Sequence, residues 1–301
     1  MFELRNPKVA APVVLFAGLV WSFGPLVVRY MNDPHLIPWQ YIFGRGLTIF
    51  ILLNLYLFFE EGKNFYKNYF KMGLSGLIGG SGLGVAMISF MFSITNTSAA
   101  ITLLCLAAMP FFTALLAFLF LKEKISLNVW VSIFIATVGI GIMAVGNNAQ
   151  TSFVGFVFGI TSSLGFAVFS VTLRWRKETP KFTTTAFAGF FCFVFATIVI
   201  LNKDLVFFSS SYNSSLFSLH GTLVCLGLIL YSIGSKAIPA AELTLLSLTE
   251  VIGGIFWVWL PLFGINEIPT TNTIIGGFFL FISLTYYSLV MRWNKRYIGL
   301  N

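Results

Sequence analysis

Ten apolar segments, each of roughly 20 residues, follow one another along this chain, and an α-helix of that length crosses the hydrocarbon core of a membrane. Only 9% of the 301 residues are charged, against about 25% in soluble domains. So few charges cannot cover a soluble surface. The sequence therefore predicts an all-α integral membrane protein with ten transmembrane helices. The predicted spans are residues 10–30, 37–59, 70–94, 98–121, 127–145, 152–175, 182–201, 215–236, 240–263 and 271–291.

Lysine and arginine gather in alternate loops between these spans. With the N-terminus in the cytoplasm, fifteen of the 18 basic residues fall on the cytoplasmic side, Arg29 and Lys203 fall outside, and Arg45 lies within a span. Positive residues favour the cytoplasmic side of a membrane, so both termini are expected there. The net charge of +8 is spread over these small groups. It forms no single basic patch, so no nucleic-acid partner is expected.

The two halves of the chain repeat one another. The segment "GLVWSFGPLVV" (18–28) aligns with "GITSSLGFAVF" (159–169) at an offset of 141 positions. The segment "SAAITLLCLA" (98–107) aligns with "PAAELTLLSLT" (239–249) at the same offset, with one inserted residue. Five spans per half is an odd number, so the second copy must lie inverted in the membrane relative to the first.

Residues 1–150 and 151–301 are therefore predicted as two inverted five-helix repeats, an architecture of many secondary transporters. The chain also resembles the drug/metabolite transporter superfamily, in its ten-helix EamA-type branch. The likeness is carried by "WSFGPLVVRY", "FGRG", "TNTSAAITLLCLAAMPFFTALLAFLFLKEKIS" (95–126) and "LYSIGSKAIPAAELTLLSLTEVIGGIFWVWLPLFGINEIPT" (230–270). Val251 departs from it, because the family often has proline after the glutamate. The resemblance covers essentially the whole chain and implies a substrate cavity between the halves, with alternating access.

Glu250 lies near the middle of the ninth span, in "AAELTLLSLTEVIGG" (240–254), which we interpret as the first half of one apolar helix. A charge at that depth costs roughly 2.5–3.5 kcal/mol on insertion scales, so something must offset it. Arg45 is the available cation. The sequence leaves open whether Arg45 and Glu250 form a structural ion pair or whether one or both contact a substrate. A carboxylate withdrawn from water gains affinity for a proton, which makes Glu250 the candidate for proton coupling. Glu242, near the start of the span, fits a helix N-terminus favoured by the dipole.

Other candidates for the cavity wall are polar and aromatic residues within the spans. In the first span "WSFGP" combines an aromatic, a hydroxyl and a kink, and packing alone is the competing explanation for each aromatic. The full candidate set is Trp21, Ser22, Arg45, Phe90, Ser163, Tyr231, Thr249, Glu250 and Trp257. His220, near the outer end of the eighth span, is expected to pack at the membrane interface. The tandem glycines Gly76, Gly80 and Gly84 predict close helix packing in the third span.

The leading functional hypothesis is a secondary transporter, since no Walker A pattern for ATP occurs. Sparse charges suit a zwitterionic or amphipathic solute, with Glu250 meeting an ammonium and Arg45 a carboxylate. Family likeness suggests amino acids or related metabolites, export, and the bacterial inner membrane. One alternative is a lipid or amphiphile flippase. An integral membrane enzyme is the other, although no nucleophile with a base and no metal motif is present. No cofactor is expected, small solutes and membrane lipid are the expected partners, and the sequence allows a monomer or a homodimer.

Overall fold

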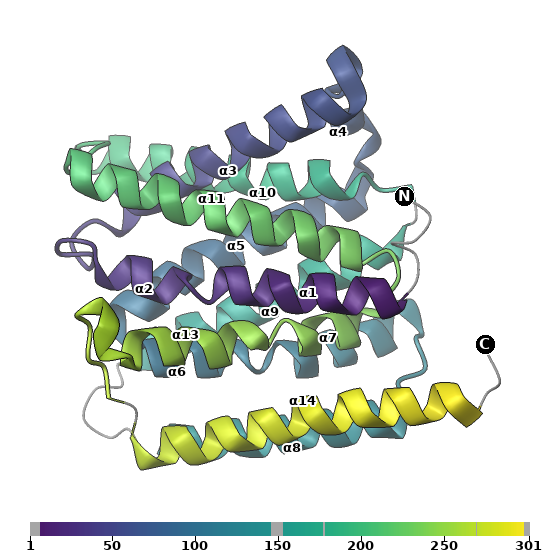
Figure 1. Cartoon of the computed structure of the whole chain (residues 1–301). Helices are drawn as coiled ribbons and strands as arrows, with labels where there is room; N and C mark the ends of the chain where they lie inside the picture. The colour runs from purple at the N-terminus through teal and green to yellow at the C-terminus, as the bar shows by residue number, and fades with distance from the viewer. Residues whose placement is uncertain (1–6, 146–152, 177, 269, 298–301) are drawn as a thin grey trace.

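The computed structural model describes residues 7–145, 153–176, 178–268 and 270–297, and all regular structure in them is helical. The long helices run roughly side by side through one bundle (Figure 1). The helices of the first half are α1 (Pro7–Trp21), α2 (Gly24–Arg29), α3 (Pro38–Glu61), α4 (Lys67–Lys71), α5 (Gly73–Asn96), α6 (Ala99–Leu106), α7 (Met109–Leu116) and α8 (Leu127–Val145). Those of the second half are α9 (Phe153–Trp175), α10 (Lys181–Asn202), α11 (Ser211–Gly234), α12 (Ala240–Leu246), α13 (Thr249–Trp259) and α14 (Thr271–Tyr297). Short turns of other helix types are η2 (Gly62–Asn64), η3 (Ala117–Leu121) and η4 (Pro261–Phe263).

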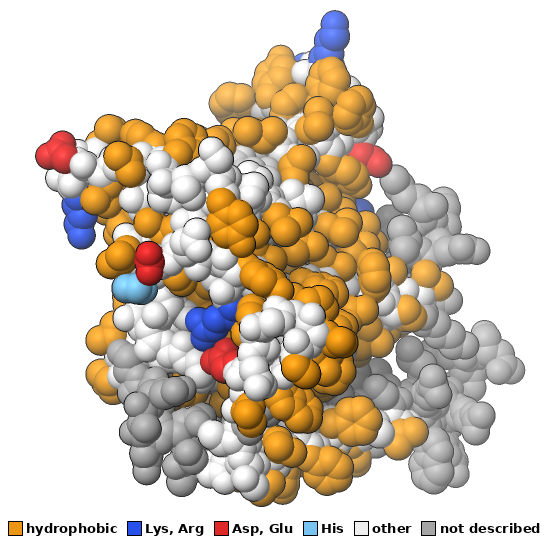
Figure 2. Space-filling view, turned by 60° about the vertical axis from the view of Figure 1, so that its left-hand side comes forward, with side chains coloured by type: hydrophobic (Ala, Val, Ile, Leu, Met, Phe, Trp, Pro, Cys, Tyr) orange, Lys and Arg blue, Asp and Glu red, His pale blue; other side chains and the backbone are white. Residues whose placement is uncertain are grey.

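Eight stretches of the described chain are helices long and apolar enough to cross a membrane, with mean hydropathies from 1.5 to 2.4. Two shorter apolar stretches lie in α8 (Leu127–Ile142) and α14 (Ile274–Ser283). Each of the ten predicted segments coincides with one of these. Hydrophobic side chains cover most of the face in Figure 2, and charged ones gather in a few places. A surface so apolar is stable in lipid rather than in water, so the chain is a multi-pass membrane protein.

The main packing pairs join one half of the chain to the other. α5 packs along α9, α3 along α10, α1 along α11, and α8 along α14. α10 also packs on α5, and α11 on α3. The α8–α14 pair lies at one edge of the bundle (Figure 1). The interior is therefore built between the halves, not within each.

The glycine ridge of α5 packs closely against α10, as the sequence predicts. A Cβ added at Gly80 would lie 2.8 Å from the carbonyl oxygen of Thr184, and one at Gly84 would collide with the ring of Phe191. Only glycine leaves room for this approach of two backbones.

Two of the membrane stretches are interrupted ahead of a proline. The first divides into α1 and α2 at Ser22 and Phe23, just before Pro25, and the fourth divides into α6 and α7 at residues 107–108, just before Pro110. Proline has no N–H to donate and its ring clashes with the preceding turn. Both breaks therefore follow directly from the sequence.

A third break, between α12 and α13, has no proline, and here the prediction of one continuous helix over residues 240–254 is wrong. A hydroxyl bonds a backbone carbonyl beside the break: Ser247 Oγ donates to Thr244 O at 2.8 Å. Such side-chain bonds compete with helical ones. The break places Glu250 in the first turn of α13, a new helix N-terminus inside the membrane stretch.

Candidate functional site

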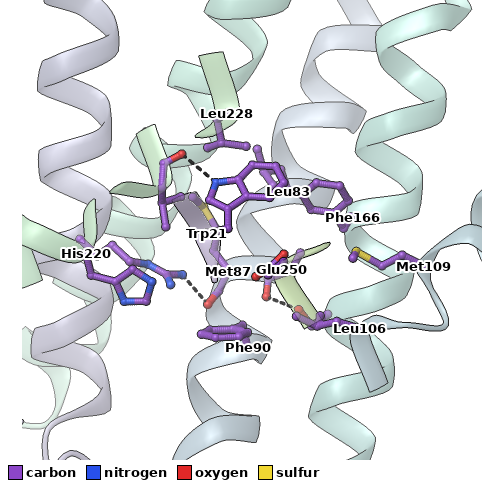
Figure 3. Close-up of a pocket in the computed structure, with 14 residues that line it drawn as sticks. Trp21, Leu83, Met87, Phe90, Leu106, Met109, Phe166, His220, Leu228 and Glu250 are labelled. Carbon is purple, nitrogen blue, oxygen red and sulfur yellow. Dashed lines mark hydrogen bonds between the residues drawn. The ribbon is translucent and has the colours of Figure 1, made fainter. Parts of the chain in front are cut away.

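A cavity lies inside the bundle, and its lining includes Leu106, Met109 and Glu250, which lie beside the breaks of the fourth and ninth membrane stretches (Figure 3). Its volume of about 70 Å³ exceeds the ~10–15 Å³ that one water molecule needs. Both halves of the chain contribute to the wall, through α1, α3, α5, α6, α7, α9, α11 and α13. The lining residues are Trp21, Arg45, Leu83, Ala86, Met87, Phe90, Leu106, Met109, Ser162, Phe166, His220, Val224, Leu228 and Glu250.

One wall carries Arg45, which is only 4% exposed and is held by uncharged groups. Its Nη1 donates to the Tyr41 hydroxyl at 3.0 Å and its Nη2 to the Met87 carbonyl at 2.8 Å. The guanidinium carbon also lies 5.1 Å from the ring centroid of Tyr41 and 5.9 Å from that of Phe90, within cation–π range. Tyr41 is hydrogen-bonded in turn to Nδ1 of His220. These contacts fix the cation's position and leave its charge uncancelled.

The wall also carries Glu250, whose side chain lies at the cavity in Figure 3. Within the described parts of the chain, no hydrogen bond or ion pair reaches its carboxylate; in particular, Arg45 does not form one with it. A helix N-terminus favours an anion through the aligned peptide dipoles. The helix start at Thr249 therefore offsets part of the cost of burying the Glu250 charge, for which the sequence had offered only Arg45 as a partner.

Trp21 lies flat in the wall because α11 comes close to it. Its Nε1 donates to the Val224 carbonyl at 3.2 Å, and any Cβ at Gly227 would collide with the indole. Its ring packs against Phe166 at 5.7 Å and Tyr231 at 5.5 Å between centroids. The polar edge of the indole is thus satisfied by backbone, and its face is available to the cavity as an apolar surface.

Four of the predicted candidates therefore line this cavity: Trp21, Arg45, Phe90 and Glu250. Two others pack behind it. Tyr231 is fully buried and hydrogen-bonded to Ser170 at 2.6 Å, and its ring lies behind those of Trp21 and Phe166. Ser163 bonds the Cys105 carbonyl, while its neighbour Ser162 faces the cavity and donates to Ala86 O at 2.9 Å.

The remaining three candidates join α1 to α13 beside the cavity. Trp257 Nε1 donates to Ser22 Oγ at 2.7 Å, and Trp257 stacks on Phe23 with ring centroids 4.8 Å apart. Thr249 Oγ1 donates to the Leu15 carbonyl at 3.1 Å. In this conformation their polar atoms are bonded within the protein, so they connect helices outside the cavity wall.

His220 is the lining residue that sequence reasoning placed wrongly. We expected it near the outer end of its span, packed at the membrane interface, because the span was taken to begin at residue 215. α11 begins at Ser211, so His220 lies deeper, is buried, and faces the cavity next to Tyr41. The capping hydroxyl of Ser210, which accepts from Asn213 N at 3.0 Å, is the signal in the sequence for this earlier start.

The arrangement is suited to binding a small solute with two opposite charges. A fixed cation and a carboxylate free of protein bonds face one cavity, whose other lining residues are mostly aromatic and aliphatic. Among the described residues, no group of three or more His, Cys, Asp or Glu side chains is placed to hold a metal ion. The cavity therefore presents both charged and apolar groups to a molecule that enters it.

Comparison with known proteins points to transport. Residues 9–145 match the EamA-like transporter family. Two proteins described as "Uncharacterized transporter", from Helicobacter pylori strains J99 and 26695, are each 27% identical over 169 residues, 55% of this chain and 55% of theirs. The match thus spans about half the length of these relatives. A solved crystal structure matches 95% of this chain and 98% of its own, with a TM-score of 0.69 and 15% identity, which shows a shared fold.

Proposed function

We propose that this chain, whose residues 9–145 match the EamA-like transporter family, is a secondary transporter for a small zwitterionic or amphipathic organic solute. Amino acids and related metabolites are the proposed substrate class. The carboxylate of the solute binds Arg45 and its ammonium binds Glu250. Following the resemblance to drug/metabolite transporters, we propose export across the bacterial inner membrane.

The observation that carries this proposal is the pair of opposite charges that face one cavity without touching each other. Arg45 comes from the first half of the chain and Glu250 from the second. Burying a charge without a partner is costly. Two such charges kept apart across a cavity are best explained by a ligand that joins them.

The packing of the helices supports two inverted repeats and alternating access. Suppose that the first five spans correspond in order to the last five. The packing of α5 against α9 then corresponds to that of α11 against α1, and the packing of α10 against α5 to that of α3 against α11. All four packings are present. The pairs α3–α10 and α8–α14 each correspond to themselves. This exchange of partners is what a two-fold axis in the membrane plane produces, and movement of one repeat against the other exposes the cavity to each side in turn.

We further propose ten crossings with both termini in the cytoplasm. The start of α1 and the end of α14 lie at the same end of the bundle in Figure 1, as an even number of crossings requires. The basic residues of the alternate loops give the orientation.

The test is solute counterflow in proteoliposomes, with a panel of labelled amino acids and metabolites. Wild type is compared with Glu250→Gln, and Glu242→Gln is the matched control, since Glu242 does not line the cavity. We expect counterflow in wild type and in the control, and its loss in Glu250→Gln. Equal counterflow in all three proteins would contradict a substrate role for Glu250.

The same variant separates substrate binding from proton coupling. Counterflow needs no proton gradient, whereas uphill accumulation does. If Glu250 carries the coupling proton only, Glu250→Gln keeps counterflow and loses accumulation driven by a pH gradient. If vesicles show scrambling of labelled lipids without solute flux, the flippase alternative replaces the proposed function.

A further inference from the structure

Two ion pairs join the halves of the molecule. Arg29 Nε lies 3.2 Å from Glu267 Oε2, and Arg174 Nε lies 2.9 Å from Glu123 Oε1. In each pair the arginine belongs to one half and the glutamate to the other. The side chains are about one quarter exposed, between 22% and 27%.

The two pairs correspond to each other under the internal repeat. Each arginine stands at the end of the first membrane stretch of its half, in α2 and α9. Each glutamate follows the fourth membrane stretch of the other half, after η3 and after η4. Each arginine also bonds a carbonyl in the turn before an interrupted stretch: Arg29 bonds Thr97 O, and Arg174 bonds Ile238 O.

The pairs lie at opposite ends of the bundle. Between Arg29 and Arg174 the chain passes through the membrane stretches of α3, α5, α6–α7, α8 and α9, which is an odd number of passes. The pair of Arg29 and Glu267 is called the outer latch here, and the pair of Arg174 and Glu123 the inner latch, after the orientation proposed above.

The outer latch connects the end of α2 to two other segments. Arg29 Nη2 donates to Glu267 Oε1 at 3.3 Å, Nη1 donates to the Ile94 carbonyl at 3.1 Å, and Glu267 Oε1 accepts from Ala99 N at 3.1 Å. It thus holds α2, the α5–α6 turn and the loop after α13 together. The inner latch makes two bonds, from Arg174 Nε to Glu123 at 2.9 Å and from Nη1 to Ile238 O at 2.7 Å.

We propose that the two latches are the gates of the transport path, each closing the cavity at one end. The inference rests on the proposed transport function and deepens it, because alternating access requires that the two ends open in turn. Partly exposed ion pairs contribute little individually, which suits contacts that must break in every cycle. Both latches are formed in this conformation, and opening of either end separates one pair.

The test measures which side of the membrane reaches the cavity, without any substrate. A single cysteine replaces Ala86 in the cavity wall, in a background where Cys105, Cys192 and Cys225 are replaced by alanine. A water-soluble maleimide is added to right-side-out or to inside-out vesicles. The compared proteins are the parent, Glu267→Gln and Glu123→Gln.

We expect Glu267→Gln to raise labelling in right-side-out vesicles and Glu123→Gln to raise it in inside-out vesicles, each by about twofold to fivefold, the range of a weak ion pair. Unchanged labelling, or an increase from the same side for both variants, would overturn the proposal. The labelling experiment involves no solute, so it tests the gates independently of the substrate. Side-specific labelling without amino-acid counterflow would contradict the proposed substrate class and still support the gates.

Discussion

The two charged walls of the cavity are built in contrasting ways. Arg45 is held by Tyr41, Met87 and two aromatic rings, while the structure describes no partner atom for the carboxylate of Glu250. The arginine is a fixed reference point before any solute arrives. The glutamate is stabilised by the start of α13 and is free to accept a new partner.

This difference separates the two roles that the charges play. A preorganised cation positions a carboxylate with little loss of entropy on binding. A carboxylate without a fixed partner changes most when an ammonium or a proton arrives. Substitutions at the two walls and beside the cavity test this contrast.

Glu250→Gln removes the charge without changing the size of the side chain. We expect counterflow to fall about tenfold to a hundredfold, because a charge-assisted hydrogen bond contributes roughly 1.5–3 kcal/mol. Initial rates in proteoliposomes measure the effect, with Glu242→Gln as the control. Equal losses in the two variants would mean that the defect arises from the α12–α13 segment and not from the cavity.

Arg45→Lys keeps the positive charge and loses the planar fork that reaches both Tyr41 and the Met87 carbonyl. The apparent Kd for the solute should rise about tenfold, since roughly one hydrogen bond's contribution is lost. Arg176→Lys, at an exposed position between α9 and α10, is the control. Unaltered affinity in Arg45→Lys would show that only the charge matters and that the fixed geometry of this wall has no role.

Tyr41→Phe removes the hydroxyl that connects Arg45 to His220. The guanidinium keeps its bond to Met87, so we expect a weaker effect, a rise in Kd of about twofold to fivefold, and no loss of maximal rate. Tyr66→Phe, at an exposed position, serves as the control. A defect as severe as that of Glu250→Gln would mean that Tyr41 or His220 acts directly on the solute.

Ser22→Ala breaks the hydrogen bond with Trp257 beside the cavity. Transport should change by less than about twofold, while the free energy of unfolding in detergent falls by about 1 kcal/mol. Trp257→Phe removes the same bond from the other side, so the double variant should be little worse than either single one. If the losses of stability in the two single variants add up in the double variant, or if Ser22→Ala abolishes transport, these residues act at the substrate site and not only as a contact between helices.

The sequence predicts the membrane stretches well, since hydrophobicity over about 20 residues is a local property. It also predicts the breaks at Pro25 and Pro110, because proline acts on its own helix. The break before Glu250 could not be predicted in this way. No proline marks it, and the serine and threonine beside it, Ser247 and Thr249, are residue types that also occur in many unbroken helices.

The sequence predicts some residues of the site but not the direction in which each side chain points. Depth along a span identifies Arg45 and Glu250, since a charge inside a membrane demands a function or a partner. It does not tell which way a residue faces. Tyr231 lies behind the cavity, because the packing of α9 against α11 decides its direction, while His220 faces it.

The central claim is that one solute joins Arg45 to Glu250. The most direct measurement compares binding of three compounds: the amino acid with the strongest counterflow, its analogue without the amino group, and its analogue without the carboxylate. Each is measured on wild type, Arg45→Gln and Glu250→Gln. The account predicts that Glu250→Gln no longer weakens the analogue without the amino group, and that Arg45→Gln no longer weakens the analogue without the carboxylate. If both substitutions weaken all three compounds equally, the charges do not contact the solute and the claim is wrong.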